Sequence, residues 1–123
     1  GLEALSRGAR RCLFAETDAA ACRVIRANLA SLGLTGGLVA QRDALAVLRD
    51  EASAARRHEL VLLDPPYGRW ADVEERLGRL LAPVLADAAV VVVETDAAIQ
   101  PTLPLSLRTT RRYGSARLTL FDP

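Results

Sequence analysis

Short apolar runs alternate with amphipathic segments along most of the 123-residue chain, and this rhythm limits the folds it can adopt. The run ELVLLD at 59–64 is almost wholly apolar, as in a parallel strand covered on both faces. Parallel strands joined through helices require right-handed crossovers, so the rhythm predicts an α/β fold with an open, mostly parallel sheet. We expect strands at 11–16, 37–41, 59–64 and 88–94, and helices at 17–33, around 45–52 and at 71–82.

Each expected helix carries apolar residues at helical spacing, which predicts one inward face. The first helix has Thr17 or Asp18 as a capping residue at its start, and Gly33 can end it. The inward residues are expected to be Cys22, Ile25, Leu29 and Leu32 in the first helix, Leu45, Leu48 and Ala52 in the second, and Val73, Leu77 and Leu80 in the third.

The end of the chain has a different pattern. Residues 105–112 and 116–121 resemble two strands joined by YGSA, with Gly114 as the turn residue. A short connection of this kind predicts an antiparallel hairpin.

Composition favours an ordinary globular domain, since half of the residues are apolar and the formal net charge is +1. The longest apolar run, 88–93, is far shorter than the roughly 20 residues that span a bilayer, and no secretory signal is visible. Cys12 and Cys22 have no CxxC spacing or nearby histidine cluster, so we expect free thiols in a reducing cytoplasm and no metal site.

Acidic residues follow four of the expected strands: Glu16, Asp43, Asp64, and Glu94 with Asp96. Ligands of open α/β sheets bind beyond the carboxyl ends of the strands, so these acids can surround one cleft. Asp and Glu are also common helix caps, and each acid taken singly fits either role.

Glu16 has the position of an acid that accepts hydrogen bonds from the ribose hydroxyls of a nucleotide cofactor. Such an acid lies about 20 residues beyond the first glycine of a glycine-rich turn. Gly1 opens a helix and fits the last glycine of that turn, the first glycine then lying upstream.

The sequence Asp64-Pro65-Pro66-Tyr67 lies where the buried strand meets the expected cleft. Prolines fix φ and donate no backbone hydrogen bond, so the loop is stiff and its carbonyls can accept. The Asp64 carboxylate and the Pro65 carbonyl can each accept one N–H of an exocyclic aromatic amine, and Tyr67 can stack on the ring. Rate enhancement would then come mainly from placement beside an electrophile, without a metal.

These segments together resemble the RsmD type of S-adenosylmethionine-dependent methyltransferases, which methylate the N2 amine of a guanine in small-subunit (16S) ribosomal RNA. The matching segments, in family order, are GLEALSRGA, ETD, RDAL, LVLLDPPYG, VVVVETD and YGSARLTLF. The resemblance implies a Rossmann-like class I methyltransferase fold, S-adenosyl-L-methionine as cofactor, and ribosomal RNA in the small subunit or an assembly intermediate as partner.

The resemblance also implies roles for individual residues. Glu16 would contact the cofactor ribose, Asp43 with the Ala44 backbone the adenine edge, and Gly1 would be the final glycine of the cofactor loop. Asp64, Pro65, Pro66 and Tyr67 would receive the target amine.

The chain departs from the family at its start, where the first strand and the earlier glycines of the loop have no counterpart. In the family that strand lies between those expected here at 11–16 and 59–64, so its lack would leave a gap in the sheet. We therefore expect residues 1–123 to form one methyltransferase domain that is partial at its N-terminal side.

Some residues have less specific interpretations. Arg69, and less readily Arg111 and Arg112, can contact RNA phosphates or simply be solvated. Trp70 can extend the base-stacking surface or pack as the apolar residue that leads into a helix. His58 lies at the wrong end of its strand for catalysis and is expected to be a solvated loop residue.

Other functions stay open on sequence alone. The same chemistry on adenine N6 of DNA or on a protein glutamine uses the same Pro-Pro loop. A dinucleotide-binding oxidoreductase would share Gly1 and Glu16 but has no use for residues 64–67. A non-catalytic fragment or interaction module is a further alternative.

Overall fold

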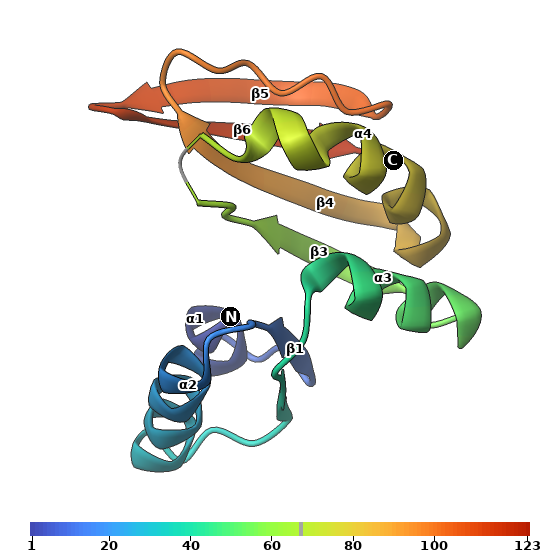
Figure 1. Cartoon of the computed structure of the whole chain (residues 1–123). Coiled ribbons are helices and arrows are strands. Elements are labelled where there is room, and N and C mark those ends of the chain that lie inside the picture. Colours follow the sequence, from blue (N-terminus) through green and yellow to red (C-terminus); the bar gives the residue numbers. More distant parts are fainter. Residues whose placement is uncertain (67) are drawn as a thin grey trace. The chain divides into compact units, whose positions relative to one another are not determined.

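The computed structural model describes residues 1–66 and 68–123 (Figure 1). Tyr67, which the sequence predicts to stack on a base, therefore lies outside the described residues. The chain divides into two compact units, Gly1–Val47 and Leu48–Pro123, and each is described by itself.

The first unit contains one parallel strand pair with its helices. Its elements are α1 (Leu2–Ser6), β1 (Cys12–Ala15), α2 (Ala19–Ser31) and β2 (Gly37–Ala40), followed by the start of α3 (Ala44–Ser53). β1 and β2 are parallel, with Cys12 opposite Gly37 and Ala15 opposite Ala40. The predicted order of elements is confirmed here, and each strand is slightly shorter than expected.

The ends of α2 follow the predicted capping chemistry. The side chain of Asp18 accepts a hydrogen bond from the Ala21 N–H at 2.9 Å, so Asp18 rather than Thr17 is the cap. Gly33 adopts a φ of +63° immediately after the helix, as a glycine that ends a helix does. Cys22 and Leu29 are buried as predicted, whereas Leu32 is 61% exposed because the helix ends at Ser31 and Leu32 falls in its cap.

The second unit contains a four-stranded sheet in the order β3-β4-β6-β5. Its elements after α3 are β3 (His58–Leu63), α4 (Trp70–Leu81), the short 3₁₀ helix η1 (Ala82–Val84), β4 (Leu85–Asp96), β5 (Ser106–Tyr113) and β6 (Ala116–Asp122). β5 and β6 form the predicted antiparallel hairpin, and Gly114 lies in its turn with a φ of +59°.

The strands form a mixed arrangement that includes the predicted antiparallel hairpin, and the mostly parallel character predicted for the sheet is not confirmed. β1 pairs with β2 and β3 with β4 in parallel, while β6 is antiparallel to both β4 and β5. The hairpin brings β6 back beside β4, which makes half of the strand pairs antiparallel. Among the described residues, β1 and β2 form one sheet and the other four strands form another.

The core of the second unit lies on one face of its sheet. β4 alternates strictly near its end, with Val91, Val93 and Thr95 buried, and α4 lies over this sheet in Figure 1. Leu60 and Leu62 of β3 are 46% and 51% exposed, so the prediction that both faces of this strand are covered is not confirmed by the described residues. Their side chains point to the opposite face from Val61 and Leu63 because strand side chains alternate.

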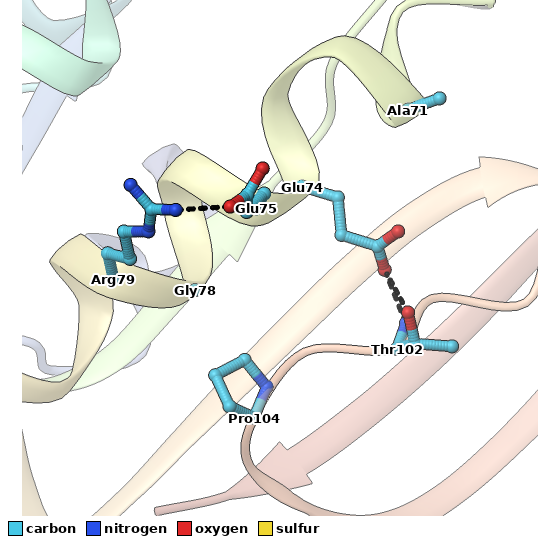
Figure 2. Close-up of a pocket in the computed structure, with 7 residues that line it drawn as sticks. All are labelled: Ala71, Glu74, Glu75, Gly78, Arg79, Thr102 and Pro104. Carbon is cyan, nitrogen blue, oxygen red and sulfur yellow. Dashed lines mark hydrogen bonds and ion pairs between the residues drawn. The ribbon is translucent and has the colours of Figure 1, made fainter.

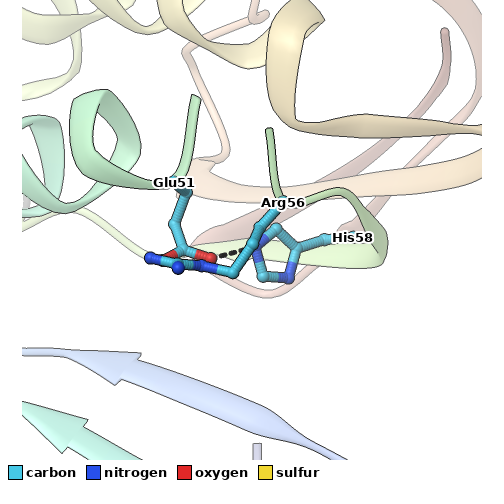
Figure 3. Close-up of polar contacts among 3 residues, drawn as sticks. All are labelled: Glu51, Arg56 and His58. Carbon is cyan, nitrogen blue, oxygen red and sulfur yellow. Dashed lines mark hydrogen bonds and ion pairs between the residues drawn. The ribbon is translucent and has the colours of Figure 1, made fainter. Parts of the chain in front are cut away.

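A cluster of three polar side chains joins the end of α3 to the start of β3 (Figure 3). The Glu51 carboxylate is buried and accepts hydrogen bonds from Arg56 Nε at 2.9 Å and Nη2 at 2.7 Å. Its other oxygen lies 2.9 Å from Nε2 of His58. The prediction that His58 is a solvated loop residue is therefore wrong, because this contact holds it as the first residue of β3.

No helix among the described residues has the length and apolar character needed to cross a membrane.

Candidate active site

The Pro-Pro loop begins directly after β3 and lines a pocket in the second unit. Described residues from two parts of the chain surround it: Asp64, Pro65, Pro66, Gly68, Trp70, Glu94, Thr95, Asp96 and Ile99. Parallel pairing of β3 with β4 brings both strand ends to the same edge of the sheet. Asp64 therefore lies beside Glu94 and Asp96, as the sequence predicted for these acids.

Local chemistry explains the shape of the loop. Arg69 donates its backbone N–H to the Pro66 carbonyl at 3.1 Å, and Gly68 has a φ of +79°, which favours glycine. The Arg69 guanidinium donates from Nε to Asp72 at 3.1 Å and its side chain stays 65% exposed. This ion pair holds Arg69 at the start of α4, and its predicted contact with RNA stays a prediction.

The Asp64 side chain is exposed, and no described residue donates a hydrogen bond to its carboxylate. A carboxylate in this state can accept from an incoming N–H donor. Pro65 is partly buried and cannot donate, so its carbonyl is the neighbouring acceptor. Two acceptors on a stiff loop suit a planar NH₂ group.

Trp70 forms the first residue of α4 and is only 3% exposed. This burial agrees with the prediction that it packs as an apolar residue at the start of the helix. Its indole Nε1 is buried and has no hydrogen-bond partner among the described residues. An N–H of this kind carries a desolvation cost of about 1–3 kcal/mol.

The turn after β4 completes the lining of the pocket. Thr95 Oγ1 donates to the Ile99 carbonyl at 3.1 Å, and Asp96 Oδ1 accepts from the Ala98 N–H at 2.9 Å. Sequence reasoning identified Glu94 and Asp96 but missed Thr95 and Ile99. Strand alternation in VVVVETD would have placed Thr95 on the buried face, whereas the position of Ile99 depends on how the turn folds.

Glu16 and Asp43 lie at one edge of the sheet in the first unit. Each follows a strand of the parallel pair, and the last residues of those strands, Ala15 and Ala40, are register partners. Glu16 Oε1 accepts from the Asp18 N–H at 3.0 Å, while Asp43 Oδ2 accepts from the Ala46 N–H at 3.1 Å at the start of α3. Asp43 therefore acts as a helix cap, and one carboxylate oxygen of each residue is not used in these bonds.

Gly1 fits tightly against β1. A Cβ atom on Gly1 would lie 2.2 Å from Cε1 of Phe14, so any side chain there would displace the ring. Close packing of a helix start against a strand is the role of the third glycine in a nucleotide-binding turn. This contact is an observation in favour of the cofactor loop predicted from Gly1. Ala44, the other predicted cofactor contact, is exposed at the first position of α3.

The predicted site residues thus fall into two sets. Gly1, Glu16, Asp43 and Ala44 belong to the first unit, whereas Asp64, Pro65, Pro66, Arg69 and Trp70 belong to the second. In the described part of the chain, no group of three or more His, Cys, Asp or Glu side chains is placed to hold a metal ion. Burial raises the pKa of the Cys12 thiol above its ordinary value.

A second pocket of about 400 Å³ lies between α4 and the segment that leads to β5 (Figure 2). Glu74 accepts hydrogen bonds from the backbone N–H and the hydroxyl of Thr102. Arg79 pairs with Glu75, and a Cβ on Gly78 would lie 2.8 Å from Pro104. Because Glu74, Glu75 and Arg79 each already have a partner, this pocket offers no set of groups that converge on a ligand.

Comparison with known proteins places the chain among methyltransferase folds. The SAM-dependent methyltransferase from Agrobacterium tumefaciens has a TM-score of 0.76 at 15% identity, over 99% of this chain and 51% of that one. A hypothetical protein of Thermus thermophilus has a TM-score of 0.83 at 28% identity, over 100% of this chain and 68% of that one. The chain therefore has the fold of a SAM-dependent methyltransferase.

The sequence comparisons identify the family. Ribosomal RNA small subunit methyltransferase D of Escherichia coli K12 is 34% identical over 97 residues, covering 78% of this chain and 47% of that protein. The chain spans about half the length of the curated relatives it matches. The family described as "Conserved hypothetical protein 95" matches residues 1–122. The chain therefore belongs to this family, and the resemblance of its motifs to RsmD-type methyltransferases is confirmed.

Proposed function

We propose that residues 1–123 form the methyltransferase domain of an enzyme that transfers a methyl group from S-adenosyl-L-methionine to the N2 amine of a guanine in 16S ribosomal RNA. The observation that carries this proposal is the pocket beyond β3, where Asp64, Pro65 and Pro66 meet the acidic end of β4. The name of the Escherichia coli relative, a small-subunit ribosomal RNA methyltransferase, supports the choice of substrate. The enzyme would act in the cytoplasm on the small subunit or its assembly intermediate.

Cofactor binding is proposed for the sheet edge of the first unit. The unused carboxylate oxygen of Glu16 would accept from the ribose hydroxyls, and Asp43 with the Ala44 backbone would contact the adenine. The close approach of Gly1 to Phe14 fits a helix start that must pack against β1 without a side chain. When bound, the cofactor supplies an electrophilic methyl group on a sulfonium.

Acceptor binding is proposed for the Pro-Pro loop. The Asp64 carboxylate and the Pro65 carbonyl each accept one N–H of the amine, which draws the nitrogen lone pair out of conjugation with the ring. Tyr67, predicted from the sequence, would stack on the base, a contact worth about 1–3 kcal/mol. Because the loop is stiff, the amine is held in line for attack, and placement supplies most of the rate enhancement.

The proposed transfer is a single displacement. With the cofactor bound, the N–C bond would form as the S–C bond breaks, which would leave S-adenosylhomocysteine and a methylated amine that carries an extra proton. That proton is acidic only after alkylation, so the chain needs no base before the attack. Asp64, already hydrogen-bonded to the amine, can accept it or pass it to water.

The experiment is a methyl-transfer assay on the protein as its gene encodes it. The protein is incubated with isotopically labelled S-adenosylmethionine and unmethylated small ribosomal subunits, and the RNA is digested to nucleosides for mass spectrometry. The proposal predicts labelled N2-methylguanosine. Label in N6-methyladenine of DNA, or in a glutamine of an added protein, would instead identify one of the alternative substrates. A complete lack of transfer to any of these acceptors would contradict an enzymatic role.

A further inference from the structure

Arg117 is a buried arginine in the segment YGSARLTLF, and the sequence alone indicates no role for it. It lies on β6 with only 8% of its surface exposed. Its Nε and Nη2 donate to the Ala97 carbonyl at 3.2 and 2.9 Å, and its Nη1 donates to Gln100 Oε1 at 2.7 Å. A further bond from Nη1 reaches Thr110 Oγ1 on β5 at 3.3 Å. One guanidinium thus joins the hairpin to the segment that follows β4.

The segment that Arg117 holds is the turn at 96–100, which lines the candidate acceptor pocket. Ala97 donates its N–H to the Ser115 carbonyl at 2.8 Å, and Ile99 donates to the Asp96 carbonyl at 2.9 Å. Asp96 and Ile99 themselves line the pocket with Asp64. The turn is therefore bonded to the hairpin through Arg117 and Ser115, and to β4 through the hydroxyl of Thr95.

The charge of Arg117 has no carboxylate partner within ion-pair distance among the described residues. Burying a guanidinium is costly, and here carbonyl, amide and hydroxyl acceptors compensate for it. A planar fork with several donors can meet acceptors on two segments at once, which a lysine ammonium cannot. Hydrogen bonds to the turn, rather than an ion pair, therefore offset the desolvation free energy of the buried guanidinium.

We propose that Arg117 is a positioning residue for the acceptor pocket, because it fixes the turn at 96–100 against the hairpin. The proposal rests on the function proposed above. Loosening the turn would leave the pocket with one mobile side, so the target base would bind in several orientations. Cofactor contacts belong to residues of the first unit and should be unaffected.

Two variants test this role, one by changing the donor side chain and the other by removing an acceptor. Arg117→Lys keeps the charge and the apolar stem but loses the fork. Gln100→Ala removes one of the two acceptors on the turn and leaves the Ala97 carbonyl in place. Because Gln100 is exposed, this variant should fold even if the Arg117 variant does not. Arg108→Gln is the matched control, since Arg108 lies on the same hairpin and pairs with Asp122 instead.

The first readout is steady-state methyl transfer to small-subunit RNA together with the affinity for S-adenosylmethionine. Both test variants should lower kcat/KM for RNA, by about 10- to 100-fold for Arg117→Lys and less for Gln100→Ala, with the cofactor Kd unchanged. A purely structural role would instead lower the folded fraction, reducing apparent kcat without a change in KM. The Arg108→Gln variant should match the wild type.

The second readout does not need activity. Trp70 is the single tryptophan of the chain and lines the same pocket, so its fluorescence reports on the turn. Arg117→Lys and Gln100→Ala should shift Trp70 emission to longer wavelength while far-UV circular dichroism stays unchanged. If the wild type transfers no methyl group, the proposed function fails and this emission shift still decides the positioning role. The proposal would be overturned if Gln100→Ala kept both the wild-type kcat/KM and the wild-type Trp70 emission. It would also be overturned if the only effect of Arg117→Lys were a smaller folded fraction, with KM and the emission of the folded protein unchanged.

Discussion

The Glu51 cluster allows a stability prediction whose size follows from the structure. Glu51 is 6% exposed, and its carboxylate accepts two hydrogen bonds from Arg56 and contacts His58. Hydrogen bonds to charged groups contribute about 1.5–3 kcal/mol when buried. The Arg56 side chain is 47% exposed and glutamine retains one carbonyl acceptor, so Glu51→Gln should lower the free energy of unfolding by about 1–2 kcal/mol.

The same cluster predicts how this difference depends on pH. The hydrogen bonds from Arg56 lower the pKa of the Glu51 carboxyl, with a further contribution from His58, although burial acts in the opposite direction. A lowered folded-state pKa means that the stabilisation is complete above the unfolded value of about 4.3 and is lost as pH falls through the folded pKa. The difference between wild type and Glu51→Gln should therefore be largest near neutral pH and disappear in acid.

The assay is urea unfolding followed by the fluorescence of Trp70, which lies in the same unit as Glu51. Glu75→Gln is the matched control, because Glu75 pairs with Arg79 on α4 but its side chain is 77% exposed. That control should change the free energy of unfolding by no more than a few tenths of a kcal/mol. Equal stability of wild type and Glu51→Gln at neutral pH, or a difference that persists in acid, would refute the reasoning.

Two further predictions concern the first unit. Glu16→Gln should weaken S-adenosylmethionine binding by about 10- to 100-fold in calorimetry, because a charged acceptor for the ribose is lost. The control variant Glu3→Gln, at an exposed position, should bind the cofactor normally. Equal affinities of wild type and Glu16→Gln would show that Glu16 is not part of the cofactor site. Gly36→Ala should destabilise the chain more than Gly33→Ala in thermal unfolding by circular dichroism. Both have positive φ, but only at Gly36 would a Cβ lie 2.2 Å from a backbone carbonyl, that of Arg10. Gly33→Ala should cost about 1–2 kcal/mol, and a smaller effect at Gly36 would contradict this account.

Features that depend on near neighbours could be predicted from the sequence. The order of strands and helices, a cap at Thr17 or Asp18, the helix end at Gly33 and the turn at Gly114 all follow from spacing and residue type. The acids after β3 and β4 were also expected at one edge, because parallel pairing requires it.

Features that depend on contacts between distant segments could not be predicted. His58 contacts Glu51 only because the end of α3 folds back on β3, and nothing in the local sequence indicates this. Ile99 reaches the pocket through a turn bonded to Arg117, which lies on β6, the second strand of the hairpin. The exposure of Leu60 depends on which face of the sheet is covered, and an apolar run does not specify that face.

The central claim is that Asp64 holds the acceptor amine, and single-turnover methyl transfer by Asp64→Asn tests it most directly. The amide keeps the shape of the carboxylate but loses its charge and offers N–H groups toward an N–H donor. At saturating cofactor the rate should fall by about 100- to 1,000-fold, with the Kd for S-adenosylmethionine unchanged. Asp87→Asn, an exposed acid at the other end of β4, should transfer normally. A wild-type rate in Asp64→Asn would contradict the account.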